Sequence, residues 1–239
     1  MTVQTGGEAV SARIGAVALP LGVILLVVST MLHPSREDPM DNPAVFREYA
    51  EHEGWVAVHF GQWVAGLLFF AGLVALYYSL TARPGRATLP ARLGLAAVVV
   101  TAAALTMLQA VDGVALKWAV DTWTAAPADR QDAAFAAAET LRWTEYSLQS
   151  YFSILLGLTL ILFGLAIAAG SAYPRWTGWL AAASGAAWIV HGLMVPYIGL
   201  FESVPRGIAS VLMYLWSFIM AFLMWRRAGR EAEAAPSAA

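Results

Sequence analysis

Four ionisable side chains stand within apolar stretches of the sequence, where such groups are costly in a membrane and usually functional. They are Asp112, Glu145, His59 and His191. A carboxyl group that leaves water favours its protonated form, so Asp112 and Glu145 are candidate general acids, although Arg142 stands three residues before Glu145 and can pair with it. An imidazole titrates near neutrality, so either histidine can act as a base or a relay. These four residues predict acid–base chemistry inside the membrane.

Further polar and aromatic side chains recur at helical spacing beside these candidate catalytic residues. The predicted ligand-binding residues are Gln62, Trp63, Gln109, Tyr146, Gln149, Trp188 and Tyr214. With a rise of about 1.5 Å per residue, most of the polar positions lie within roughly 5–13 Å of the same membrane boundary. This shared depth predicts a pocket that opens to the outer side. An alternative remains open, because acids, histidines, Trp and Tyr also gather in the wet interface at helix ends.

Six apolar runs must position these side chains, and each reaches the roughly 17–25 residues that a helix needs to cross a bilayer. They are about residues 12–32, 55–80, 90–116, 143–169, 176–199 and 206–225. The composition is 59% hydrophobic and 13% charged, with a mean hydropathy of +0.64, which leaves little mass for a soluble unit. The predicted fold class is therefore an all-α polytopic membrane protein with six transmembrane helices, in a single domain covering residues 1–239.

Charge predicts the orientation of the six helices. Arginines gather in the short 83–92 loop and in the tail after residue 225, and basic loops stay in the cytoplasm. All acidic residues except Glu8, Glu231 and Glu233 then fall on the outer side. Both termini are therefore expected in the cytoplasm, and the lipid bilayer is the first expected partner.

Two segments outside the apolar runs are expected to form short amphipathic helices on the outer surface, at about residues 43–53 and 127–142. In the first, Asn42 can cap the helix and Pro43 suits its first position. Val45, Phe46 and Tyr49 then share one side. The second segment is expected to run directly into the fourth apolar helix.

Composition also bears on cofactors. The chain has no cysteine, which excludes disulfides, thiolate zinc sites, iron–sulfur clusters and a cysteine nucleophile. A metal would need His, Asp or Glu ligands, and His59 with His191 would be the pair to hold a haem, but no metal-binding spacing is present. Metal content and cofactors are thus unknown from sequence. The basic residues form no patch for a nucleic acid, so none is expected as a partner.

Four short strings carry a family resemblance: His-Pro-Ser at 33–35, Asn-Pro-Ala-Val-Phe at 42–46, Ala-Val-Asp-Gly-Val-Ala-Leu-Lys at 110–117 and Tyr-Pro-Arg-Trp-Thr-Gly-Trp at 173–179. With them the chain resembles small six-span membrane proteins of high-GC bacteria, a domain of unknown function. The resemblance covers most of residues 12–225. It implies the fold and a bacterial plasma (inner) membrane, but it implies no activity and assigns no functional residue.

The favoured hypothesis is an outward-facing intramembrane pocket for a lipophilic small molecule, with isomerase- or cyclase-type acid–base chemistry on a prenyl-like lipid. The alternative is a noncatalytic protein that binds a lipid or cofactor, or an accessory subunit of a membrane complex. Gly15, Ala18 and Gly22 of the first apolar run would then offer a packing face for a membrane-protein partner or a second copy. A transporter ranks third, because the chain lacks inverted repeats and a polar path across the bilayer.

Overall fold

The computed structural model describes residues 3–199 and 204–233, which are helical with short connections and contain no strand. Six helices are long and apolar enough to cross a membrane, which confirms the predicted fold class. The helices are α1 (Val3–Met31), α2 (Asn42–Glu51), α3 (Trp55–Thr81), α4 (Thr88–Ala110), the π-helical segment η1 (Val111–Leu116), α5 (Lys117–Ala125), α6 (Gln131–Ala169), α7 (Arg175–Ile198) and α8 (Val204–Glu233).

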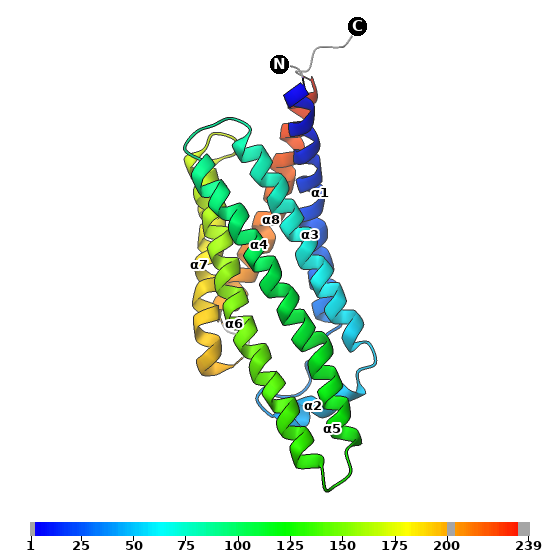
Figure 1. Cartoon of the computed structure of the whole chain (residues 1–239). Coiled ribbons are helices and arrows are strands. Elements are labelled where there is room, and N and C mark those ends of the chain that lie inside the picture. The colour runs from blue at the N-terminus through cyan, green and yellow to red at the C-terminus, as the bar shows by residue number, and fades with distance from the viewer. Residues whose placement is uncertain (1–2, 200–203, 234–239) are drawn as a thin grey trace.

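The six long helices form a ring in the order α1, α3, α4, α6, α7, α8, and α8 returns to α1 (Figure 1). Bulky side chains such as Leu73, Phe163 and Trp216 fill the space between them. The tightest pair is α6 and α7, where Gly157 and Gly164 of α6 approach the backbone of α7 too closely for a side chain. Small residues of this kind allow close helix packing within a bilayer.

The small residues of α1 pack inside the chain. A side chain at Gly22 would collide with backbone atoms of Ala65 and Phe69 on α3, and one at Gly15 would collide with Met224 on α8. Ala18 is buried as well. This face of α1 is therefore occupied by the protein's own helices, so it is not a free packing face for a partner.

The structure differs from the predicted boundaries where α4 and α6 leave the apolar runs. The third predicted helix ends at residue 116, whereas the chain stays helical through η1 and α5 to Ala125. No proline interrupts this stretch, and the helix ends where Ala126 becomes extended before Pro127. The segment predicted at 127–142 does run into the next helix as expected, but it begins at Gln131.

A small helical cap covers one end of the ring, opposite the end where α1 begins and α8 finishes (Figure 1). We define the cap as α2, α5 and residues 131–142 of α6. Its own apolar cluster consists of Val45, Phe46, Tyr49, Trp55, Leu116, Val120, Trp123 and Ala138. The predicted common side of Val45, Phe46 and Tyr49 is thus confirmed.

The capping residue of α2 is not the one predicted. The carboxylate of Asp41 accepts the backbone N–H of Ala44 at 3.2 Å. Asn42 is the first helical residue, and its side chain donates to Glu139 of α6 at 2.9 Å. Asp and Asn are similarly good caps, so their adjacent positions leave the start of α2 ambiguous by one residue in the sequence.

Candidate functional site

A buried histidine and aspartate meet at the capped end of the ring. Nε2 of His59 on α3 lies 3.1 Å from Oδ2 of Asp112 in η1, with side chains 2% and 14% exposed. His59 Nδ1 lies 2.8 Å from the carbonyl oxygen of Trp55, and because a carbonyl only accepts, Nδ1 carries a proton. Without a second proton, Nε2 and the carboxylate oxygen would be two acceptors in contact. The pair therefore holds one further proton between these two atoms. It can rest on either partner, as in an imidazolium–carboxylate or an imidazole–carboxylic acid pair.

The π-helical geometry of η1 presents Asp112 to α3. A π-helical turn holds more residues than an α-helical turn, and such segments are frequent at functional sites. The backbone carbonyl of Asp112 accepts the indole N–H of Trp55 at 3.0 Å. Gly113 lies against His59 so closely that a side chain there would collide with the histidine. Glycine at this position thus allows the close approach of η1 and α3.

A second buried ion pair lies beside the first. Nη1 of Arg142 contacts Oε2 of Glu145 at 2.6 Å, with both side chains 4% exposed, which confirms the pairing expected from their spacing. The guanidinium also lies over the rings of Tyr49 and Tyr146, at 5.3 and 4.7 Å from their centres. Both members of the pair interact electrostatically with Asp112. The capped end therefore holds two carboxylates, an arginine and His59 in one cluster.

Not all polar atoms of this cluster are satisfied. Within the described part of the chain, Asp112 Oδ1 and Arg142 Nε are buried and make no hydrogen bond, and the contact of His59 Nε2 is with Asp112. Buried polar groups are normally paired, and clusters of exceptions mark functional sites or places where a ligand or water completes the set. The cluster therefore has donors and acceptors to offer to a bound molecule.

Three aromatic members of the cluster are not among the predicted site residues. The ring of Trp55 lies 4.0 Å from that of Tyr49 and 4.4 Å from that of His59. His33, in the segment after α1, packs on Trp55 and His59 at 4.9 and 5.2 Å between ring centres. Burial lowers the pKa of His33, against the opposing effect of the Asp112 carboxylate, which favours a neutral ring. His33 lies outside the apolar runs, so helix periodicity could not predict its place in the site.

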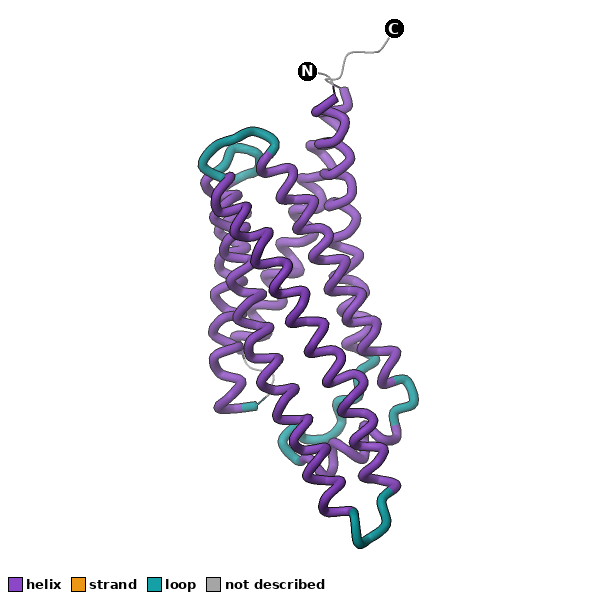
Figure 2. The backbone as a smooth tube through the Cα atoms, in the orientation of Figure 1, coloured by secondary structure: helices purple, strands orange, loops and turns teal. Residues whose placement is uncertain are grey.

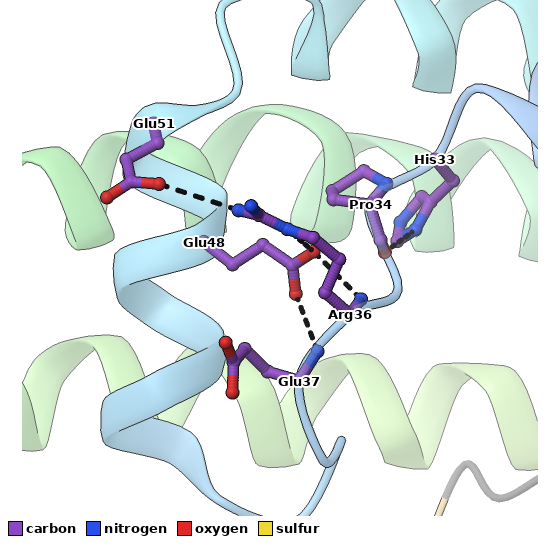
Figure 3. A network of polar contacts seen from close by, with 6 residues as sticks. All are labelled: His33, Pro34, Arg36, Glu37, Glu48 and Glu51. Carbon is purple, nitrogen blue, oxygen red and sulfur yellow. Dashed lines mark hydrogen bonds and ion pairs between the residues drawn. The ribbon is translucent and has the colours of Figure 1, made fainter.

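The segment that carries His33 is held down by Glu48 of α2 (Figure 3). The buried Glu48 carboxylate accepts the backbone N–H groups of Arg36 at 2.9 Å and Glu37 at 3.2 Å. It also pairs with Nε of Arg36 at 3.3 Å. Burial by itself raises the pKa of Glu48, but these backbone and side-chain donors outweigh it and hold the pKa below its usual range.

This arrangement predicts an acid-sensitive segment. Because the pKa of Glu48 is depressed in the folded state, its stabilising effect is complete above the ordinary glutamate pKa of about 4.3 and is lost as pH falls through the folded value. Hydrogen-exchange protection of residues 33–41 should therefore collapse at acid pH. In Glu48→Gln protection should be low at every pH, whereas Glu51→Gln, which removes only an exposed contact to Arg36, should behave as wild type. Acid-independent protection in the wild type would contradict this role.

A groove beside His59 opens between α3 and the α4–η1 helix. Its volume is about 170 Å³, and it is lined by Val56, His59, Phe60, Trp63, Thr106, Gln109, Ala110, Gly113 and Val114. Trp63 donates its indole N–H to Thr106 at 3.0 Å, and Gln109 donates to Gln62 at 3.4 Å. Phe60 and Val114 are exposed on the outer surface of the ring, so the groove faces the surroundings of the helices.

Of the remaining predicted residues, Tyr146 contacts the cluster through the Arg142 guanidinium, and the others do not join it. Tyr146 donates to the carbonyl of Pro39 at 2.9 Å, and Gln149 donates to Ser153 at 3.0 Å. His191 and Trp188 lie together on α7, with ring centres 5.8 Å apart, and Tyr214 of α8 packs against the main apolar core. Since α7 packs on α6 and α8 while α3 packs on α1 and α4, the ring separates His191 from His59.

The contacts of His59 also bear on metals and haem. Both ring nitrogens of His59 are engaged, Nδ1 by the Trp55 carbonyl and Nε2 by Asp112, so the structure does not support a haem held by His59 and His191. Across residues 3–199 and 204–233, no three His, Asp or Glu side chains are grouped to hold a metal ion.

Fold and site together define a class: an all-helical integral membrane protein of six spanning helices, with a buried charged cluster under a small cap. Comparison with protein families, curated proteins and solved structures finds no match to the chain. What the site does must therefore follow from its own geometry.

Proposed function

We propose that the protein belongs to the plasma membrane of a high-GC bacterium, as the family resemblance implies, with both termini in the cytoplasm and the cap outside. The distribution of charge supports this orientation. Arginines of the loops and helix ends lie opposite the cap, and basic residues near helix ends favour the cytoplasmic side. These arginines include Arg83, Arg86, Arg92, Arg175 and Arg226.

At the capped end, the proposed activity is proton transfer to and from a lipophilic small molecule with prenyl-like chemistry. The observation that carries this proposal is the buried His59–Asp112 contact at 3.1 Å, which involves a proton and borders a groove facing the lipid. An isomerisation places one proton on carbon and removes another, without net change. A pair in which either member can hold the proton suits both steps, with Asp112 as acid and His59 as base.

The groove suits an apolar ligand that comes from the membrane. Its exposed rim is apolar, so a ligand can reach His59 without passing through water. At about 170 Å³ it accommodates the reacting portion of a chain while the remainder stays among the lipids. The faces of Phe60 and Trp63 offer electron density to a cationic intermediate such as protonation of a double bond creates.

Arg142 and Glu145 have a supporting role in this proposal. Glu145 is held by Arg142 at 2.6 Å, so its carboxyl group is less available to a substrate than that of Asp112. The guanidinium adds positive potential near Asp112, which moderates the charge of that carboxylate after it gives up a proton. His33 and Trp55 pack over His59, and Tyr49 packs on both of them, so the three rings exclude water from the site.

Filling the groove provides the test. Ala110 lines the groove and is exposed, so Ala110→Phe should occupy it without disturbing the core. Ala103, two turns earlier on α4, is also exposed but does not line the groove, so Ala103→Phe is the matched control. Native mass spectrometry from mild detergent should find an apolar molecule retained by the wild type and by Ala103→Phe, and at least tenfold less in Ala110→Phe. Equal retention in both variants would overturn the assignment of the groove.

A further inference from the structure

A second cavity lies at the opposite end of the ring from the cap. Its volume is about 680 Å³, within the range of small-molecule sites. The loops 82–87 and 170–174 border it, and Figure 2 shows them together at the end where α1 begins. Five arginines line it: Arg83, Arg86, Arg175, Arg227 and Arg230. No acidic residue is among its lining residues.

Four of these arginines form no ion pair among the described residues, unlike three basic residues at the cap end. Arg36, Lys117 and Arg142 each form an ion pair with a carboxylate. Within the described residues, Arg83, Arg86, Arg175 and Arg230 form none. Like charges gathered around one hollow repel, and an anion placed among them relieves that repulsion.

Helix ends in the cavity wall add to its positive potential, and side-chain contacts order that wall. α4 begins at Thr88 and α7 at Arg175, and their N-terminal ends flank the cavity through Ala87 and Arg175. Helix N-termini carry partial positive charge and favour anions. Ser79 in the wall lies within 2.6 Å of the Tyr173 hydroxyl, and the Arg227 guanidinium lies over the Tyr173 ring at 5.7 Å.

We propose that this cavity binds a phosphate-bearing anion. Arginine is the side chain best shaped for phosphate, since its planar guanidinium donates two parallel hydrogen bonds. The same chemistry is found in the headgroup of an anionic phospholipid and in a soluble phosphate compound, and basic pockets between membrane helices are known to take lipid headgroups. The site is separate from the His59 groove and does not depend on its function.

Arginines that act only in membrane orientation would not need to surround a hollow. Three other arginines at the same end, Arg13, Arg92 and Arg226, are exposed and do not line the cavity. They provide a matched control, because replacing them removes the same charge from the same end of the molecule.

The experiment compares the wild type with two triple variants. The lining variant is Arg83→Gln, Arg86→Gln and Arg230→Gln, and the control is Arg13→Gln, Arg92→Gln and Arg226→Gln. Phosphatidylglycerol retention relative to phosphatidylcholine is measured by native mass spectrometry, and pyrophosphate binding by calorimetry in neutral detergent. The lining variant should bind at least one of the phosphate probes tenfold or more weakly, with the control within twofold of wild type.

The two probes separate the sources of the ligand. Loss confined to phosphatidylglycerol identifies a lipid headgroup, and loss of pyrophosphate binding identifies a soluble phosphate compound. If the lining variant does not fold, the single charge reversal Arg86→Glu in the exposed 82–87 loop replaces it, with an expected weakening of at least fivefold. An equal loss of probe binding in both triple variants would show that diffuse surface charge causes the binding, and this would overturn the proposal. Absence of binding to either probe by the wild type would also overturn it.

Discussion

Asp112→Asn is expected to slow solvent deuterium incorporation into the lipophilic substrate by about 100-fold or more, the usual contribution of a general acid. The amide occupies the same space as the carboxylate but cannot deliver the proton that the His59–Asp112 pair involves. The measurement uses purified protein in vesicles of total membrane lipid in heavy water. Mass spectrometry of the extracted isoprenoid lipids then follows the label, which identifies the substrate as well as the rate.

Asp121→Asn is the control for this substitution. Asp121 lies on α5, the helical continuation of η1, but its side chain is 48% exposed and pairs with Lys117. The Asp121→Asn variant should label lipids at the wild-type rate. Labelling by Asp112→Asn at that same rate would remove Asp112 from the chemistry. If the wild type retains an apolar molecule but labels nothing, the site binds without catalysis, which is the noncatalytic alternative.

Arg142→Met is expected to destabilise the protein by about 3–5 kcal/mol, because removing one member of a buried ion pair leaves the other charge uncompensated. Glu145 is almost completely buried, and Arg142 is its ion-pair partner. The Arg142→Met substitution also removes the guanidinium that lies over the rings of Tyr49 and Tyr146, so the cap should unfold before the rest of the protein. Unfolding in mixed micelles, followed by tryptophan fluorescence, measures the change in free energy.

The double variant Arg142→Met with Glu145→Gln separates charge from packing. If uncompensated charge causes the loss, the double variant should recover most of the stability, since neither member is then ionised. A double variant as unstable as Arg142→Met would instead show that the guanidinium acts through its packing on Tyr49 and Tyr146. A single variant within 1 kcal/mol of wild type, by contrast, would mean that Glu145 does not remain as a buried, uncompensated charge.

The spanning helices were predictable because the bilayer imposes a length and an apolar composition on each one. Helix periodicity also placed His59 and Asp112 on polar faces, since it needs only the sequence of one helix. Which faces meet depends on the order of helices around the ring, and periodicity carries no information about that order. His191 and Trp188 occupy an equally polar face of α7, but that helix packs against α6 and α8 rather than α3.

The arrangement of the cap residues around the site could not be predicted for a different reason. The positions of His33 over His59 and of Tyr49 beside His33 depend on how a loop and a short helix fold back on the ring. Glu48 holds that loop through backbone N–H groups, which every residue but proline possesses and which leave no pattern in the sequence. The π-helical segment η1 likewise packs against α3 and α6, contacts that the sequence of one helix does not contain.

The shared proton of His59 and Asp112 is the basis of the proposed function, and nitrogen NMR of the histidine rings tests it most directly. The chain has four histidines, so protein with ¹⁵N-labelled histidine in lipid nanodiscs gives few signals, and His59→Gln identifies those of His59. In the wild type, Nδ1 of His59 should be protonated and Nε2 displaced from the position of a free neutral imidazole. Asp112→Asn should return Nε2 to that position, while Asp121→Asn should leave it unchanged. An identical His59 spectrum in the wild type and in Asp112→Asn would show that the two residues share no proton.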